Sequence, residues 1–302
     1  MQAVVEHSPA PGASAQKGKG AGFLLLSPAV LILLVWSLVP LGMTLWYSLL
    51  NYNLVDPTLH GFAGFSNYWY LLTDPDFLHS LLNTFILVAG VLVISVGGGT
   101  LLAVLYDQEF FGRGIARVLV ISPFFIMPTV SALLWKNLML HPIYGVYSAM
   151  MRAVGLTPID WLAKFPLLTV MMIVAWEWLP FAVLILLTAV QSLDSEQKEA
   201  ARMDGAGPIA RFRHIILPHL GRAISVVVMI ETIYLLTVFA EISVTTAGGP
   251  GVASTNLAYL IYSRALLQFD VGGASAGGII AIIIANIVAV FLVRSVARNL
   301  EV

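Results

Sequence analysis

Three stretches without a charged residue constrain the fold of this chain more than any other feature. They cover residues 21–55, 77–106 and 271–293. A helix needs about 20 largely apolar residues to cross the hydrocarbon core of a bilayer, and each stretch is long enough. Hydrophobic residues make up 59% of the chain and charged residues 10%, whereas soluble domains carry about 25% charged residues. Such a chain cannot cover a water-facing surface, so we predict an all-α integral membrane protein.

Six transmembrane helices are predicted. They lie at about residues 22–49, 80–106, 115–140, 166–192, 223–244 and 271–293. The third has Arg117 and Lys136 near its two ends, and the fourth contains Glu177. The fifth contains Glu231 and Glu241. A buried soluble helix is the alternative for any one of them, and their lengths argue against it. A cleaved signal peptide is the alternative for the first, whose apolar run exceeds the usual span of about 7–15 residues.

The placement of Lys and Arg predicts the orientation. With the N-terminus inside, the inner segments hold eleven of these residues, and the outer segments hold Arg152, Lys164 and Arg264. Lys136 falls near the outer end of the third span. Since Lys and Arg accumulate on the cytoplasmic side of membrane proteins, both termini are predicted to be cytoplasmic. Residues 1–20, rich in Ala, Gly, Ser and Pro, are predicted to be a disordered cytoplasmic tail ahead of a transmembrane domain over residues 21–302.

The longest inner loop, residues 194–222, has the pattern of a helix, a turn and a second helix outside the membrane. Asp194 or Ser195 can cap a helix start, and good helix formers follow. Gly205 permits a sharp backbone turn that other residues resist. Pro218 marks the approach to the fifth span. By composition alone, an ordinary basic connection that obeys the positive-inside rule fits this loop equally well.

The spacing within this loop resembles the signature of the integral-membrane subunits of bacterial ABC importers. The signature comprises Glu199-Ala200-Ala201, then after three residues Gly205, after nine more Ile215, and after one more Leu217-Pro218. The residues that also match its sugar-importer form are Asp204, Ala206 and Phe212. The resemblance implies a coupling helix that docks on a separate cytoplasmic ATPase. In this scheme Gly205 sets the bend, so closure of the ATPase moves the membrane helices as rigid bodies.

Other segments resemble the permeases of maltose-type carbohydrate importers, and the opening region resembles the first of their two permeases. The segments are residues 62–68, 73–75, 83–84, 176–181, 248–250 and 254–255. Residues 249–278 are similar to the permeases of sorbitol/mannitol importers. The resemblance implies a bacterial inner-membrane location and a neutral sugar alcohol or sugar as the cargo. Besides the lipid bilayer, it implies three protein partners, namely a homologous second permease, a cytoplasmic ATPase dimer and an extracytoplasmic solute-binding protein.

No residues for catalysis are found in the sequence. Gly18-Lys19 is the only Gly-Lys pair, and Gly20 follows it where a phosphate-binding Walker A loop needs Ser or Thr. ATP and Mg²⁺ are therefore expected on a partner ATPase, and this chain is not expected to be an enzyme. The chain has no cysteine, and no cluster of carboxylates with histidines predicts a metal site. The net charge of −1 gives no indication of nucleic-acid binding.

Two glutamates are predicted near the middle of the membrane, where ionisable residues are functional candidates. Glu177 and Glu231 would both lie roughly 15 Å deep, at 1.5 Å per residue along their helices. They are candidates for a substrate path in which carboxylates accept hydrogen bonds from sugar hydroxyls. The tryptophans that would pack on a carbon skeleton are Trp135, Trp176 and Trp178. The alternative is that each glutamate bonds a neighbouring helix and orders the bundle.

A protein of another class competes with the importer subunit. A stand-alone secondary transporter or channel would use Glu177 or Glu231 as a proton relay. That interpretation leaves the signature at residues 199–218 unexplained, and the chain lacks the internal repeat that such transporters often show.

Overall fold

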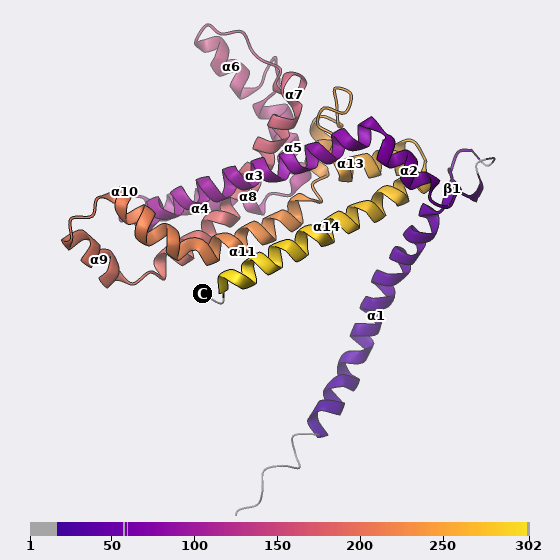
Figure 1. The fold of residues 1–302 in the computed structure, drawn as a ribbon. Coiled ribbons are helices and arrows are strands. Elements are labelled where there is room, and N and C mark those ends of the chain that lie inside the picture. The colour runs from indigo at the N-terminus through magenta and orange to yellow at the C-terminus, as the bar shows by residue number, and fades with distance from the viewer. Residues whose placement is uncertain (1–16, 57, 59, 301–302) are drawn as a thin grey trace, which may run out of the picture.

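The chain forms a bundle of long helices with one small β-hairpin (Figure 1), and the computed structural model describes residues 17–56, 58 and 60–300. The long helices are α1 (Lys17–Ser48), α3 (Pro75–Asp107), α8 (Pro166–Gln191), α11 (Leu217–Leu235) and α14 (Val271–Leu300). The shorter α-helices are α2 (Ser66–Thr73), α4 (Arg113–Ile121), α5 (Pro128–Leu133), α6 (Val146–Ala153), α7 (Trp161–Lys164), α9 (Ser195–Met203), α10 (Pro208–Arg211), α12 (Ala240–Thr245) and α13 (Leu257–Tyr262). Other helical turns are η1 (Ser122–Phe125), η2 (Leu134–Met139), η3 (Phe212–Ile216) and η4 (Ser263–Leu267). The strands β1 (Leu50–Tyr52) and β2 (His60–Phe62) pair antiparallel, with Leu50 opposite Phe62.

Five helices in the described part of the chain are long and apolar enough to cross a membrane, and a bent pair of helices supplies a sixth candidate span. The five are Leu26–Ser48, Pro75–Asp107, Pro166–Gln191, Pro208–Leu235 and Val271–Ser295. The prediction of an all-α integral membrane fold is confirmed. Of the predicted tail, residues 17–20 belong to α1 and residues 1–16 lie outside the described part.

The predicted third span is broken rather than straight. Its two arms, Arg113–Phe125 and Pro128–Met139, meet at 101°. Pro128 starts the second arm and lacks the N–H that a continuous helix would need. Met127 before it has extended backbone, with φ −63° and ψ 137°, as is usual for a residue that precedes proline. The local sequence therefore sets the bend.

The predicted fifth span, residues 223–244, also differs from the structure. Helix α11 ends at Leu235, and Glu241 lies in the separate helix α12. The Asn256 side-chain amide donates to the carbonyl of Val238 at 2.6 Å, inside the break. An unsatisfied carbonyl at membrane depth is costly, and a buried side chain that supplies the donor allows the helix to stop there. Asn256, which supplies the donor, lies outside the predicted span, so the sequence pattern of the span does not reveal the break.

Helices α3 and α8 form the centre of the bundle and run in the same direction. Their earlier residues meet in one buried cluster, exemplified by Leu87 against Val174. Their later residues meet in a second, exemplified by Ala103 against Leu186. Helix α11 contributes to both clusters, and α8 is the most deeply buried of the candidate spans.

Gly99 marks a close approach of α3 to α8. A Cβ added at Gly99 would lie 2.8 Å from the Cβ of Ala182, too close for two carbon atoms. Small residues at such positions let two helix backbones pack tightly, which is the main source of attraction between helices in lipid. The close contact therefore depends on the absence of a side chain at Gly99.

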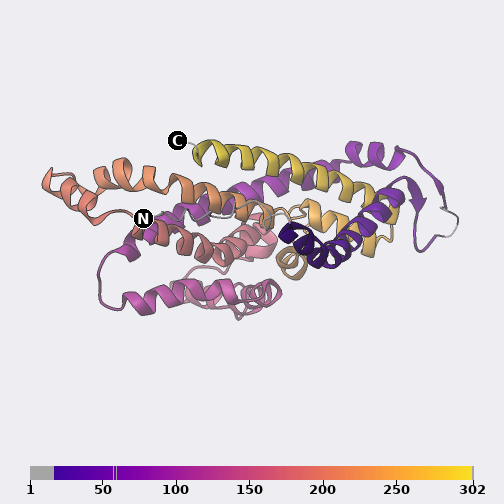
Figure 2. The ribbon, with the colours of Figure 1, turned by 90° about the horizontal axis from the view of Figure 1, so that it is seen from below.

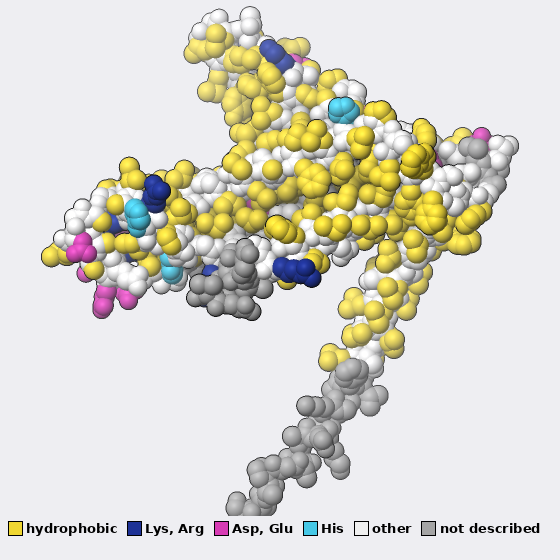
Figure 3. Space-filling model, viewed as in Figure 1, with side chains coloured by type: hydrophobic (Ala, Val, Ile, Leu, Met, Phe, Trp, Pro, Cys, Tyr) yellow, Lys and Arg dark blue, Asp and Glu magenta, His cyan; other side chains and the backbone are white. Residues whose placement is uncertain are grey.

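The other helices leave large apolar surfaces exposed. Hydrophobic side chains cover the middle of the bundle on the face seen in Figure 3, and charged ones gather at the end that carries α9 and α10. Helix α1 leaves the bundle at the end next to β1 and points away from it in Figure 1; in Figure 2, seen from below, α1 is foreshortened and overlaps the bundle. None of the most apolar stretch of α1 is buried. These surfaces need lipid or another membrane protein to cover them.

We predict that Gly99→Leu destabilises the bundle, because the new side chain would force α3 and α8 apart. Overpacking of this kind costs about 1–3 kcal/mol. Thermal unfolding of the purified protein in detergent measures the effect. Gly97→Ala is the matched control, since a Cβ at Gly97 would meet nothing within 4 Å. Equal melting temperatures for the Gly99→Leu variant and the wild type would contradict the predicted packing.

Candidate functional site

The loop at residues 194–222 forms two short helices joined by a tight turn, and it lies at the same end of the bundle as the C-terminal end of α14 (Figure 1). Helix α9 starts after Asp194, whose side chain accepts a hydrogen bond from the Glu196 amide at 3.0 Å. The helix ends at Met203, and Gly205 follows with φ +78°. Glycine adopts this left-handed conformation without strain, and it commonly ends helices in this way. The turn therefore depends on Gly205.

The residues of the predicted coupling site differ in exposure. The exposed ones are Glu199, Ala200, Asp204, Gly205, Leu217 and Pro218, the half-buried ones are Ala206 and Ile215, and the buried one is Ala201. Ala201 therefore packs toward the bundle, while the exposed group is available to another molecule. Most of the exposed residues of the site lie on α9 and the turn that follows it.

Two apolar side chains that the sequence analysis did not single out project beside this turn. Met203 at the end of α9 is 88% exposed, and Ile209 in α10 is 83% exposed. They flank Gly205 in the sequence, in a loop that is otherwise rich in charged residues. The sequence pattern that could have indicated these two residues is an apolar residue on each side of a polar turn. This pattern favours a surface that docks against a protein.

The second arm of the loop is continuous with the bundle. Helix α10, η3 and α11 form one helical rod over Pro208–Leu235. Pro218, expected to mark the approach to the fifth span, lies inside this rod. In η3 the amide of Leu217 bonds the carbonyl of Phe212, one residue wider than in an α-helix. Such a widened turn accommodates a local interruption in the row of backbone hydrogen bonds along the helix. Here the interruption is Pro218, which follows Leu217.

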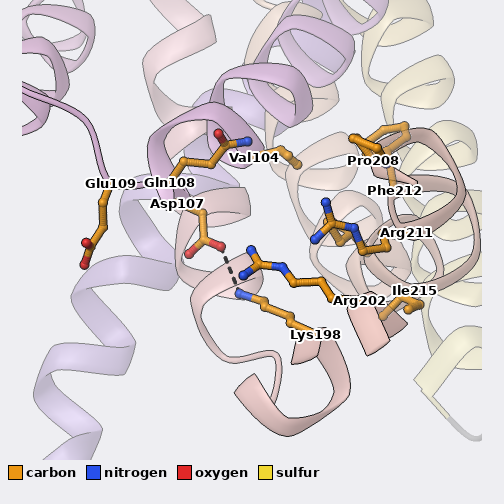
Figure 4. A pocket seen from close by; sticks show the side chains of 11 residues that line it. Val104, Asp107, Gln108, Glu109, Lys198, Arg202, Pro208, Arg211, Phe212 and Ile215 are labelled. Atoms are coloured by element: carbon orange, nitrogen blue, oxygen red, sulfur yellow. Dashed lines mark hydrogen bonds and ion pairs between the residues drawn. The ribbon is translucent and has the colours of Figure 1, made fainter. Parts of the chain in front are cut away.

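The first arm is joined to the bundle through polar contacts. Lys198 forms an ion pair with Asp107 at the end of α3, with 2.9 Å between Nζ and Oδ2. This pair lies in a cavity of about 600 Å³ between α3 and the loop (Figure 4). Where the rod enters the bundle, the His219 Nε2 lies 3.0 Å from the carbonyl oxygen of Ala189 in α8. Both arms are thus fixed to the ends of membrane-length helices.

The two predicted membrane glutamates occupy different places in the bundle. Glu231 in α11 is fully buried, and Ser95 in α3 donates a hydrogen bond to its Oε2 at 2.5 Å. Glu177 in α8 is 6% exposed and interacts with Glu241 of α12, which is 4% exposed. The structure therefore links Glu231 to a neighbouring helix, as the bundle-ordering alternative requires, and places Glu177 next to Glu241.

The three predicted tryptophans also separate into two groups. Trp135 and Trp176 meet edge to face with ring centroids 5.5 Å apart. Together with Tyr147 and Trp161 they line an apolar cavity of about 310 Å³. Trp178 instead packs against Tyr234, with centroids 5.1 Å apart. Tyr147 and Trp161 come from segments outside the predicted spans, and sequence reasoning did not connect them with the other two rings.

In the described part of the chain, no three His, Asp or Glu side chains gather in an arrangement that fits a metal ion. What the geometry offers is an exposed helical turn at one end of a membrane bundle. Such an exposed turn is accessible to a partner protein.

A bundle of membrane-length helices with an exposed helix, turn and helix at one end defines a membrane component that works with a partner. The chain belongs to the family described as the inner membrane component of binding-protein-dependent transport systems, whose model matches residues 23–302.

Several known proteins are similar to the chain over most of its length. A probable ABC transporter permease protein, y4oQ of Sinorhizobium fredii, is 34% identical over 82% of this chain and 81% of its own length. The trehalose/maltose transport system permease protein MalF of Thermococcus litoralis is 32% identical over 87% and 88% of the two chains. The sn-glycerol-3-phosphate transport system permease protein UgpA of Yersinia enterocolitica is 30% identical over 92% and 95%.

A solved structure has the same fold. A chain of a bacterial ABC transporter involved in the import of the acidic polysaccharide alginate superposes with a TM-score of 0.77. The match covers 93% of this chain and 96% of that one at 22% sequence identity. At this identity the likeness establishes the architecture of the bundle.

We predict that Ser95→Ala destabilises the protein, because it leaves the buried Glu231 carboxyl without the donor described here. A buried polar group left unsatisfied costs about 1–3 kcal/mol. Ser122→Ala is the control, since Ser122 is exposed and bonds only the nearby Leu119 carbonyl. The double variant Ser95→Ala with Glu231→Leu should recover stability in thermal unfolding. A melting temperature that stays unchanged in Ser95→Ala would show that this bond does not order the bundle.

Proposed function

We propose that this chain is the permease subunit of an ATP-driven importer and that residues 194–222 couple it to a separate ATPase. The observation that carries the proposal is the exposed turn at Gly205, with Met203 and Ile209 beside it, at the end of a rod that continues to Leu235. A force applied to the turn moves this rod as a unit, because the helix is unbroken over that length. Membership of the family supports the same role.

The orientation follows from this proposal. An ATPase is cytoplasmic, so the end of the bundle with α9 and α10 faces the cytoplasm. The same end carries the C-terminal end of α14 (Figure 1). The cations Arg117, Lys198, Arg202 and Arg211 belong to this end by sequence, as the positive-inside rule requires. The N-terminus is placed on the cytoplasmic side by the same rule.

The assembly has further members. The described part of the chain has at most six candidate spans, and the most apolar stretch of α1 is not covered by the rest of the bundle. A homologous second permease would supply the other half of the path and cover part of the exposed apolar surface. A solute-binding protein would deliver cargo on the opposite side. ATP and Mg²⁺ would be held by the partner ATPase, so this chain moves and does not catalyse.

The cargo is proposed to be a neutral sugar or sugar alcohol of the sorbitol/mannitol kind. A phosphorylated solute needs free cations along its path. Lys136 donates to the Val244 carbonyl at 2.8 Å, and Arg264 pairs with Asp74. Neither is free in this conformation. The cavity at Trp135 and Trp176 offers aromatic faces that suit a carbon skeleton. The names of the relatives include a disaccharide and a glycerol phosphate, so the polyol assignment rests on residues 249–278 alone.

The family match argues against a stand-alone secondary transporter. The hydrogen bond from Ser95 to Glu231 also gives that carboxyl a structural partner instead of a place in a relay.

We predict that Gly205→Val uncouples transport while the protein still reaches the membrane. Space at Gly205 is open, since an added Cβ would meet nothing within 4 Å. Any effect therefore comes from the backbone, where a branched residue with positive φ is strained by about 1–3 kcal/mol. Gly207→Ala is the matched control, because Gly207 has equally open space and φ −64°. Uptake and ATP hydrolysis by the membrane complex are the measurements. Normal uptake in Gly205→Val would overturn the assignment of the turn.

We also predict that uptake stops when ATP is depleted and continues in the presence of a protonophore. Radiolabelled mannitol and sorbitol are the probes, with maltose and sn-glycerol-3-phosphate as unlabelled competitors. The polyols are expected to compete with each other, and the phosphate is expected not to compete. Competition by the phosphate alone would overturn the neutral-cargo proposal. Uptake that ends with the protonophore while ATP persists would favour the secondary transporter.

A further inference from the structure

Lys198 occupies an unusual position within the coupling loop. Its ammonium donates to Asp107 Oδ2 at 2.9 Å and to the Val190 carbonyl at 3.2 Å. Asp107 is the last residue of α3, and Val190 is in the last turn of α8. One side chain of α9 therefore contacts the ends of the two helices that form the centre of the bundle.

The electrostatics of the position favour a cation. Both α3 and α8 end here, and the C-terminal end of a helix carries a partial negative charge. Asp107 adds a full negative charge at the C-terminal end of α3, where the helix dipole disfavours an anion. The positive charge of Lys198 offsets the carboxylate of Asp107 and the partial negative charges of both helix ends. About a quarter of each side chain of the pair is exposed, so the pair is open to the solvent and can form and break without unfolding the bundle.

Few other contacts hold α9 in place. Among the side chains of α9 that the structure describes, Lys198 alone makes hydrogen bonds to the membrane-length helices. Ala201 supplies the one buried surface of this helix. The second arm of the loop is different, because it is continuous with α11. A displacement of α9 therefore reaches α3 and α8 through Lys198 or through the short connection at Ser192–Asp194.

The rest of the cavity defines which substitutions are informative. Arg202 and Arg211 also line it, together with Glu109 (Figure 4). The close-up shows the ion pair as a dashed line from Lys198 to Asp107, with the Glu109 side chain directed away from it. The loss of Lys198 leaves Arg202 as a nearby replacement cation. Asp107 has no such substitute, so it is the more sensitive position.

We propose that Lys198 and Asp107 are positioning residues for coupling: their ion pair fixes the first helix of the loop to the ends of α3 and α8, and movement of the loop passes to that pair of helices through it. The proposal rests on the proposed function and adds a second route, beside the rod that leads to α11. It assigns a role in transport to two residues outside the signature of the loop.

The test is a set of charge variants in the complete importer, with solute moved per ATP hydrolysed as the readout. Asp107→Lys places four cations in the cavity and should lower this ratio by about fivefold or more, the lower range of coupling between sites. Lys198→Asp should lower it as well. The double variant Asp107→Lys with Lys198→Asp restores a pair of opposite charges and should recover most of the ratio. A merely structural role would change the amount of assembled complex and leave the ratio unchanged.

One control matches the charge change within the same cavity. Glu109→Lys repeats the reversal at a carboxylate that is directed away from the ion pair. It is expected to keep the ratio near that of the wild type. If Glu109→Lys lowers the ratio as much as Asp107→Lys, the cavity responds to charge in general and the proposal fails. The proposal also fails if the double variant is no better than the two single ones.

Cross-linking gives a second measurement that does not depend on folding of the charge variants. The natural chain has no cysteine, so Asp107→Cys with Lys198→Cys introduces the only two thiols. A short bifunctional thiol reagent should join them and restore coupling that the two cysteines alone have lost. Unchanged coupling before and after the link would overturn the proposal. If the wild-type complex itself moves no solute with ATP, that result rejects the proposed function. It is distinct from the results above, which reject the role of the ion pair.

Discussion

The close packing of α3 on α8 supports the rest of the structure. Gly99 and Ala182 let the two backbones approach, and buried side chains fill the contact above and below them. Lipid does not drive helices together as water does, so close packing and hydrogen bonds must supply the attraction. Helix α11 packs on this pair, and it continues directly from the second arm of the loop at residues 194–222. The loop is therefore joined to a helix that packs on the centre of the bundle.

Basic residues at the loop end have two roles. They predict the orientation of the chain, and in the structure they also neutralise the ends of helices. Arg117 donates to the Tyr106 carbonyl at 2.5 Å, in the last turn of α3, and Lys198 donates to the Val190 carbonyl of α8. Carbonyls at a helix C-terminus lack partners within the helix. A cation at this end of the bundle satisfies them, and Lys198 also joins the first helix of the loop to the bundle.

The buried polar groups of the bundle come in contacts between helices. Ser95 bonds Glu231 across α3 and α11, and Asn256 bonds the Val238 carbonyl where the chain breaks after α11. Each contact places a group that is costly in an apolar medium next to a partner from a distant segment. Such contacts fix which helices meet and at what height. In this conformation Glu231 thus has a partner on a neighbouring helix.

Several features followed from the sequence because they depend on local chemistry. Each long uncharged stretch can form a helix that is longer than the hydrocarbon core of a bilayer is thick. Such a stretch must be helical in lipid, because its backbone groups can be hydrogen-bonded only to one another. Gly205 marked the turn, because a glycine acts on its own backbone. The spacing of the signature likewise identified the loop.

Other features were decided by tertiary structure. The end of α11 at Leu235, the link from Lys198 to Asp107, and the separation of Trp178 from Trp135 and Trp176 all depend on partners far away in the sequence. A periodic or apolar pattern records which residues avoid water, but it does not record which distant group each one meets. The sequence by itself determined a membrane bundle and predicted that residues 194–222 are its coupling loop. The packing of its helices decided where the spans break and which residues tie that loop to the centre, because those outcomes arise from contacts between segments.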